Sequence, residues 1–174
     1  MIQRTYLQAL KVTDNVVVAT DDKRIYDHVN TFGRAVMTSP DHVSGTDRIF
    51  EAVSKLPEKP DYIVNVQGDE PFIQESQINQ LIDLLDGKTE LATLAKVITD
   101  EQQISNPNVV KLVRDVNGYA LYFSRFPIPF IRDQKDESVK FLKHIGMYAY
   151  RNDILEKITK LTPSSLEKSE SLEQ

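Results

Sequence analysis

The feature that most constrains the fold is the alternation of short β-branched runs with longer segments of helical spacing. The runs at residues 15–20, 62–66 and 91–97 are apolar, short and bounded by polar residues, as buried strands are. Segments such as 76–85 carry apolar side chains three and four positions apart, which places them on one helix face. Strands that alternate with helices predict an α/β domain with a mostly parallel sheet.

The second half of the chain follows another pattern. Two apolar runs, 109–114 and 119–124, flank an Asn-Gly pair, which is a strong signal for a β-hairpin. Residues 144–151 alternate sufficiently to form a further strand, and residues 153–161 have helical spacing. The chain is long enough to build one sizeable core, so we expect a single domain over residues 1–174.

The composition excludes several classes of protein. There is no cysteine, so neither a disulfide scaffold nor a cysteine-ligated metal site can form. The formal net charge of −5 argues against binding of duplex nucleic acid, whose phosphates require a basic surface. No apolar run approaches the roughly 18 residues of a membrane span, and nothing in the sequence points outside the cytoplasm. A small anionic substrate remains compatible with this charge, because a few local cations can hold it.

The most informative segment is the acidic end of the strand at residues 62–66. The sequence runs from this strand directly into Gly68, Asp69 and Glu70, and ligands of open α/β sheets bind at the carboxyl ends of strands. Gly68 would let a ligand approach the backbone closely. Asp69 could hold Mg²⁺, which needs one or two carboxylates and completes its shell with water and phosphate oxygens. The alternative is that the two carboxylates form a solvated turn or cap the next helix.

Two further segments could contact an anionic ligand. Ser44, Gly45 and Thr46 precede a predicted helix, where hydroxyls and free N–H groups can bind a base or a phosphate. Simple helix capping is the alternative for this segment. Arg125 follows a predicted strand and either clamps a carboxylate through two hydrogen bonds or is an ordinary surface arginine.

Polar residues within the later strands give a third group of candidates. Lys111 alternates with apolar neighbours, so it either points into a cleft or lies on the wet face of the hairpin. His144 and Tyr148 could bind a polyhydroxylated substrate, with a structural role as the alternative. The three histidines lie far apart without metal-ligand spacing, and the sequence contains no phosphate loop or dinucleotide fingerprint.

Five blocks cover nearly the whole chain: Asp41-His-x-Ser-Gly-Thr-Asp-Arg48, Asn65-Val-Gln-Gly-Asp-Glu-Pro71, Ala120-Leu-Tyr-Phe-Ser-Arg125, Lys143-His-Ile-Gly-x-Tyr-x-Tyr-Arg151 and Ser165-Leu-Glu-x-x-Glu-x-Leu-Glu-Gln174. In this order they resemble the family of CMP-Kdo synthetases, also called 3-deoxy-manno-octulosonate cytidylyltransferases. The blocks His-x-Gly-x-Tyr and Leu-Glu-x-x-Glu favour this family over the sialic acid type of CMP-sugar-acid synthetase, which is the nearest alternative. An alternative of another class is a fragment that keeps the fold without catalysis.

The resemblance implies a three-layer α/β/α sandwich of the nucleotide-diphospho-sugar transferase type. It implies that CTP and the eight-carbon sugar acid Kdo give CMP-Kdo and pyrophosphate, with Mg²⁺ as the cofactor. The anomeric hydroxyl of Kdo would attack the α-phosphorus of CTP in line, while Mg²⁺ offsets the charge that develops. It further implies a cytoplasmic homodimer that serves lipopolysaccharide synthesis in a Gram-negative bacterium.

The resemblance also implies roles for individual residues. Asp69 matches the family's metal ligand, and we take Asp69, Gln67 and Lys111 as the catalytic candidates. Gln67 also matches a position near the sugar acid. The expected substrate contacts are Ser44, Gly45 and Thr46 near the cytosine, Arg125, His144 and Tyr148 near the sugar acid, and Glu170 and Gln174 on a helix that also contributes to the dimer surface.

The two ends of the chain depart from the family pattern. The chain starts at Met1, where the family is already in its first helix, and stops at Gln174, before a further aspartate that shares the metal. The family's triphosphate-binding cations would lie before Met1. We therefore expect a domain that is incomplete at both ends and nearly inactive. Its 174 residues alone should bind CTP weakly, because each missing charge-assisted hydrogen bond costs roughly 1.5–3 kcal/mol.

Overall fold

The computed structural model describes residues 1–132 and 139–172. The chain divides into two compact units, each built from two stretches of sequence. The first unit comprises Met1–Ala92 and Gly146–Leu161, and the second comprises Thr93–Ile145 and Thr162–Gln174. No helix in the described part of the chain is long and apolar enough to cross a membrane.

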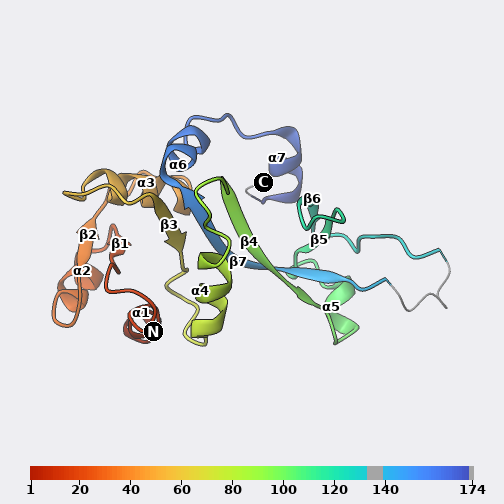
Figure 1. The fold of residues 1–174 in the computed structure, drawn as a ribbon, viewed down its shortest axis with the longest axis horizontal. Coiled ribbons are helices and arrows are strands. Elements are labelled where there is room, and N and C mark those ends of the chain that lie inside the picture. The colour runs from red at the N-terminus through yellow and green to blue at the C-terminus, as the bar shows by residue number, and fades with distance from the viewer. Residues whose placement is uncertain (133–138, 173–174) are drawn as a thin grey trace. The chain divides into compact units, whose positions relative to one another are not determined.

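The first unit begins with the strand–helix–strand pattern that the sequence predicts. Strand β1 (Val18–Thr20) pairs in parallel with β2 (Ala35–Met37), and helix α2 (Lys23–Val29) connects them (Figure 1). Asp22 caps α2 by accepting a hydrogen bond from the backbone N–H of Arg24 at 2.8 Å. A parallel pair needs such a crossover, because the chain must return to the same end of the sheet before the second strand starts.

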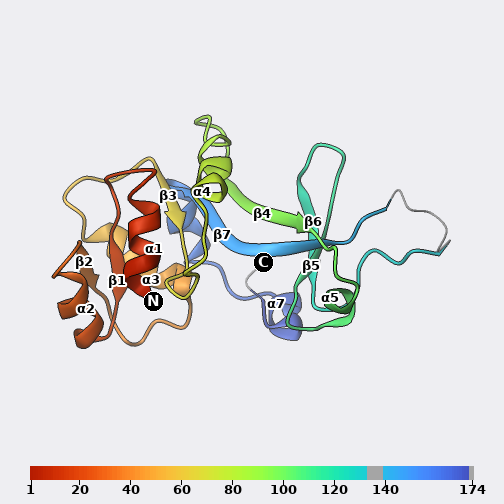
Figure 2. The same ribbon diagram turned by 90° about the horizontal axis from the view of Figure 1, so that it is seen from below.

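Helix α1 (Ile2–Ala9; red in Figure 2) is attached to the segment before β2 by the buried side chain of Tyr6. The Tyr6 hydroxyl accepts a hydrogen bond from the N–H of Arg34 at 3.2 Å, and its ring meets Phe32 edge-on with centroids 5.6 Å apart. A Cβ atom at Gly33 would lie 2.4 Å from the Tyr6 ring. Glycine is therefore required at this position for the ring to fit.

The core of the first unit forms where helices cover the pair of strands β3 and β7. Helices α3 (Gly45–Ser54) and α6 (Asn152–Ile158) pack against β3 (Tyr62–Asn65) and against the end of β7 (Leu142–Arg151). Each of these four elements contributes one buried side chain to a single apolar cluster, which consists of Val53, Ile63, Tyr150 and Leu155.

Strand β3 runs antiparallel to the end of β7. Tyr62 lies opposite Arg151, and Asn65 lies opposite Tyr148, which sets the register of the pair. Helix α4 (Glu75–Ile82) follows β3, contacts it and buries Ile78 and Leu81, two of the apolar positions in the predicted helical stripe. The β3 strand thus ends with its carboxyl terminus next to β7, and its position is fixed by helices on either side in sequence.

The second unit contains the predicted hairpin. Strands β5 (Lys111–Arg114) and β6 (Ala120–Ser124) are antiparallel. The Asp115 carboxylate shapes the turn by accepting a hydrogen bond from the N–H of Tyr119 at 2.8 Å. Gly118 adopts a φ of 93°, a backbone conformation that side chains with a Cβ atom rarely take. The hairpin prediction is therefore confirmed, and the positive φ explains why glycine stands at position 118 of the turn.

Strand β5 also pairs with β7, again antiparallel, with Lys111 opposite Lys143. Strand β4 (Leu91–Val97) pairs with β7 as well. The helices of the second unit are the single turn α5 (Gln102–Ser105) and α7 (Ser165–Glu170), and α7 lies beside the β5–β6 hairpin in both views (Figures 1 and 2). The sequence pattern did not predict α5.

The prediction of a mostly parallel sheet is wrong for the described strands. The pair β1–β2 is parallel, whereas β3–β7, β5–β6 and β5–β7 are all antiparallel. A helical crossover returns the chain to the same end of the sheet and makes the next strand parallel, whereas a tight turn reverses the chain and makes it antiparallel. Here β3 pairs instead with β7 from a distant part of the chain, and β5 and β6 are joined by a tight turn. The α/β class itself is confirmed.

Candidate functional site

The acidic turn after β3 is held in place by helix α1. A hydrogen bond from the N–H of Glu70 to the carbonyl of Gln67 closes the turn at 3.2 Å. From α1, the Thr5 hydroxyl lies 3.3 Å from the carbonyl oxygen of Gly68 and 3.4 Å from that of Glu70. A Cβ atom on Gly68 would lie 2.9 Å from Ile2 of the same helix. The side of Gly68 that a Cβ atom would occupy is thus filled by α1, while the residue itself is exposed, and close approach of a ligand to its backbone stays a prediction.

Asp69 lies in this turn and is exposed, and no partner engages its carboxylate within residues 1–132 and 139–172. In the same part of the chain, no three His, Cys, Asp or Glu side chains gather closely enough to hold a metal ion by themselves. This excludes a site of the zinc type there, which needs three or four protein ligands. A single exposed carboxylate does fit Mg²⁺, since that ion takes most of its ligands from water and phosphate.

Gln67 and Tyr148 lie with Asp69 in the first unit. The amide nitrogen of Gln67 comes within 3.2 Å of the point that a Cβ atom on Gly146 would occupy. Because Gly146 has no side chain, Gln67 can lie against β7. The Tyr148 ring packs on the core cluster and stacks on Tyr150 with centroids 5.8 Å apart. Tyr148 therefore belongs to the β3–β7 pair, and Gln67 follows β3 and lies against β7.

The segment that leads into α3, residues 38–45, is anchored to that helix by two charged side chains. Arg48 donates a hydrogen bond to the carbonyl of Ser39 at 3.3 Å, and Glu51 accepts one from the N–H of Ser39 at 2.8 Å. Hydrogen bonds from Lys55 and from that backbone N–H hold the pKa of Glu51 at about 2, so its charge persists over the physiological range. Opposite charges thus hold both sides of one residue in this segment.

The three residues expected near the cytosine have different environments. Ser44 is the N-cap of α3: its hydroxyl accepts from the N–H of Asp47 at 3.0 Å and donates to the Asp47 carboxylate at 2.9 Å. Thr46 is buried. Gly45 is exposed, and a Cβ atom there would meet nothing within 4 Å. The capping interpretation is confirmed for Ser44, and contact of the three residues with a nucleotide stays a prediction.

His144 lies in the second unit on β7 and is largely buried. Its Nε2 atom lies 2.8 Å from the Thr93 hydroxyl, which is also 3.3 Å from the carbonyl oxygen of Ile145. A hydroxyl that donates to this carbonyl has a lone pair left for Nε2–H, which favours the neutral tautomer protonated at Nε2. Burial lowers the pKa of His144 to about 4. Its ring also meets Phe123 edge-on at 5.1 Å. His144 is thus a neutral, oriented hydrogen-bonding group.

Glu170 and Arg125 fasten α7 to β6. The Glu170 carboxylate accepts hydrogen bonds from the hydroxyls of Ser124 at 2.7 Å and Tyr122 at 3.1 Å, and from the N–H of Arg125 at 2.9 Å. The bonds from Ser124 and from the Arg125 N–H lower the pKa of Glu170. In return, the Arg125 guanidinium donates to the carbonyls of Glu170 at 2.6 Å and Ser171 at 3.0 Å. Arg125 is therefore not an ordinary surface arginine.

Lys111 is buried completely, with an exposed fraction of 0%. Its Nζ atom donates to the carbonyls of Asn106 at 3.0 Å, Val109 at 2.7 Å and Arg125 at 2.5 Å, which uses all three protons of an ammonium group. Burial lowers the pKa of Lys111, and the charge of Glu170 opposes this effect. Both placements expected from the sequence, in a cleft or on the wet face of the hairpin, are wrong because the ammonium points into the protein.

The sequence matches known proteins over its whole length. The sequence profile of the cytidylyltransferase family matches residues 1–174. The chain belongs to this family. It is 52% identical over 182 residues to the 3-deoxy-manno-octulosonate cytidylyltransferase of Cytophaga hutchinsonii, and 50% identical over 184 residues to the protein of that name from Parabacteroides distasonis. Each alignment covers the whole chain and 73% of the relative.

Solved structures agree with this family. A structure of CMP:2-keto-3-deoxy-manno-octonic acid synthetase complexed with CTP superimposes with a TM-score of 0.91 and 42% identity, over 99% of this chain and 72% of that one. The 4-diphosphocytidyl-2C-methyl-D-erythritol synthase of Anaerococcus prevotii has a TM-score of 0.56 at 15% identity, over 98% and 74%, and shares the fold alone. The resemblance to CMP-Kdo synthetases that the sequence blocks indicate is confirmed.

Sequence reasoning missed the residues that hold the candidate groups of this cytidylyltransferase in place. Tyr122 and Ser124 are two residues apart on β6, so they share one face of the strand, and a polar pair in an apolar run was the available signal. Thr93, which holds His144, gave no signal because the two are 51 residues apart. Gln174 lies outside the described residues.

Proposed function

We propose that this cytidylyltransferase transfers CMP from CTP to Kdo and releases pyrophosphate. The observation that carries the proposal is the superposition of 99% of the chain on the synthetase complexed with CTP, at a TM-score of 0.91 and 42% identity. Relatives that are 50–52% identical over the whole chain carry 3-deoxy-manno-octulosonate cytidylyltransferase as their name. Agreement of this extent covers all the segments in which the candidate residues lie.

In the first unit, Asp69 is the residue proposed to hold Mg²⁺. The exposed position of Asp69 after β3 supports this role. When bound, Mg²⁺ offsets the negative charge of the nucleotide phosphates. The chain's own contribution is to hold the carboxylate at a fixed point, because the Thr5 hydroxyl and the Ile2 side chain brace the turn from α1. A braced carboxylate needs little reorganisation when the ion binds.

The segment 38–45 is proposed to face the cytosine. The proposal is supported by the bonds that fix this segment in place. Arg48 and Glu51 both bond to the backbone of Ser39, and the Ser44 hydroxyl caps α3. Such a segment would offer backbone groups at a fixed place instead of flexible side chains. The open space at Gly45 is where a flat base could approach the backbone most closely.

In the second unit, the proposed partners of the sugar acid are His144, Arg125 and Glu170. A neutral His144 suits the neighbourhood of a sugar hydroxyl, because it carries no charge that would compete for the substrate carboxylate. Arg125 carries five N–H donors. Its Nε, Nη1 and Nη2 atoms each donate one hydrogen bond within the described chain, to the carbonyls of Glu170, Pro107 and Ser171, which leaves two N–H groups for a carboxylate. Attraction of the acid group is therefore assigned to Arg125.

The remaining expectations are part of the same proposal. They are the three-layer α/β/α arrangement, a homodimer, a cytoplasmic location and a role in lipopolysaccharide synthesis. The described strands already limit the first of these, since three of the four pairs of known direction are antiparallel. Sedimentation of the purified protein would test the homodimer directly.

Substrate preference tests the proposed reaction. Pyrophosphate release is measured with CTP and Mg²⁺, once with Kdo and once with sialic acid, in the full-length protein, which here means residues 1–174 with the family's two end segments added. We expect faster turnover with Kdo. Faster turnover with sialic acid would instead identify the protein as the nearest alternative type of synthetase. Absence of turnover with both acids would favour the non-catalytic alternative.

A further inference from the structure

Two residues proposed to meet the sugar acid are anchored to Val110 and Lys111, two adjacent residues at the point where β5 begins. The N–H of His144 donates to the carbonyl of Val110 at 2.9 Å. The next residue, Lys111, donates from Nζ to the carbonyl of Arg125 at 2.5 Å. The start of β5 therefore fixes a residue of β7 on one side and a residue that follows β6 on the other.

The backbone of Arg125 is held from both sides by opposite charges. The Glu170 carboxylate accepts a hydrogen bond from the Arg125 N–H at 2.9 Å, and the Lys111 ammonium donates one to the Arg125 carbonyl at 2.5 Å. With the backbone held in this way, the guanidinium reaches the end of α7 and donates to the carbonyls of Glu170 and Ser171. The direction of the Arg125 side chain thus depends on both charged neighbours.

The buried charge of Lys111 needs an explanation beyond the filling of space. Burying an ammonium costs free energy that hydrogen bonds only partly return, and an apolar side chain of similar length would fill the same volume. Two of its three acceptors, Asn106 and Val109, lie within five residues along the chain. The third, Arg125, lies 14 residues away and is the only one of the three that carries a candidate substrate contact. The distant bond is the one that links Lys111 to the proposed site.

We infer that Lys111 is a positioning residue, which sets Arg125 and through it α7 for binding of the sugar acid without touching the substrate. The inference rests on the proposed function, because it gives the Arg125–Glu170 assembly a substrate to hold. It replaces the catalytic role that the sequence suggested for Lys111, since all three of its protons are donated to carbonyls inside the protein.

The test compares Lys111→Met with Lys143→Met in the full-length protein. Lys143 is the matched control: it lies opposite Lys111 in the β5–β7 pair, is half-buried and donates to the side chain of Gln103 at 2.9 Å. Both substitutions remove one cation from the same sheet, but only the first removes a bond to Arg125. We expect Lys111→Met to raise KM for Kdo by about tenfold or more, which is the change in affinity expected when one charge-assisted hydrogen bond is lost. KM for CTP should stay within about twofold in both variants, as should KM for Kdo in the control.

A second measurement does not depend on activity. Hydrogen exchange followed by mass spectrometry should be faster in Lys111→Met over residues 120–125 and 165–171, and unchanged there in Lys143→Met. If the unmodified protein does not turn over Kdo, the proposed function fails, and exchange in these two segments still decides whether Lys111 positions them. If turnover is present, a fall in kcat with both KM values and the exchange unchanged would overturn the inference, since that pattern reports only a smaller folded fraction.

A variant that keeps the charge covers the case in which Lys111→Met does not fold. Lys111→Arg retains donors, but a planar guanidinium cannot place one nitrogen within 3.0 Å of all three carbonyls as Nζ does. We expect a folded protein with a smaller rise in KM for Kdo and an unchanged KM for CTP. Kinetic constants and hydrogen exchange equal to those of the unmodified protein would overturn the positioning role. Lys111 would then be only a buried charge with no effect on Arg125.

Discussion

Lowering the pH is expected to destabilise this cytidylyltransferase through His144. Burial holds the pKa of His144 at about 4 in the folded protein, against an ordinary value of 6.5. Between these values the unfolded chain binds a proton that the folded protein does not bind, so the free energy of unfolding falls as the pH falls. The loss starts near pH 6.5 and is complete below about pH 4.

The two pKa values set the size of the effect. The whole interval from 6.5 to about 4 corresponds to about 3 kcal/mol, and the part between pH 7 and pH 4.5 to about 2 kcal/mol. His144→Gln removes the titrating ring and keeps an amide that can bond to Thr93. Urea unfolding at pH 7 and at pH 4.5 measures the result. The unmodified protein should lose about 2 kcal/mol more than the variant.

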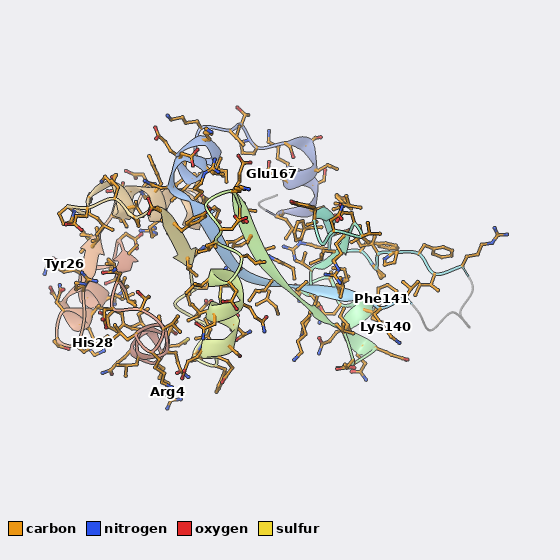
Figure 3. The ribbon with its side chains drawn as sticks, in the orientation of Figure 1. Arg4, Tyr26, His28, Lys140, Phe141 and Glu167 are labelled. Atoms are coloured by element: carbon orange, nitrogen blue, oxygen red, sulfur yellow. The ribbon has the colours of Figure 1, made fainter. Side chains whose placement is uncertain are left out.

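The matched control for this prediction is His28→Gln, because His28 is exposed on α2 (Figure 3). That substitution should leave the acid-induced loss equal to that of the unmodified protein. Equal losses in the unmodified protein and in His144→Gln would refute the reasoning, since the ring would then titrate alike in the folded and unfolded states. A neutral His144 at pH 7 also implies that KM for Kdo is insensitive to its protonation above about pH 5.

Two further predictions concern the acidic turn and the packing of α1. Asp69→Asn should lower pyrophosphate release by about 100-fold or more at saturating Mg²⁺ without a change in thermal midpoint, whereas Glu70→Gln in the same turn should keep it; near-normal turnover of Asp69→Asn would remove the assignment. Gly33→Ala should lower the free energy of unfolding by about 2–4 kcal/mol, because its Cβ would lie 2.4 Å from the Tyr6 ring and disturb the hydroxyl's hydrogen bond. Gly45→Ala, with nothing within 4 Å, should leave that free energy unchanged or raise it by up to about 1 kcal/mol in urea unfolding, and equal losses in both variants would contradict the packing argument.

Local features of the fold were predictable because they depend on neighbours in sequence. The Asn-Gly turn and the capping alternative for Ser44 are each decided within a few residues, and the structure has both. The family was predictable for another reason, since five blocks of residues in the family's order are very unlikely to match by chance. Strand pairing was not predictable in this way. The neighbour of β3 is β7, and nothing in either segment records the direction in which they pair.

The environment of Lys111 shows most clearly why the site could not be derived from the sequence. Lysine is rarely buried, so alternation with apolar neighbours could suggest only a cleft or a wet face. Its acceptors are backbone carbonyls, which every residue has, and therefore no residue type marks them. The same holds for the carbonyls of Glu170 and Ser171 that receive the Arg125 guanidinium. Motifs mark the side chains that are proposed to contact the substrate, but here main-chain carbonyls hold those side chains in place. A substitution at Lys111 is therefore expected to displace Arg125 while the motif that contains Arg125 stays intact.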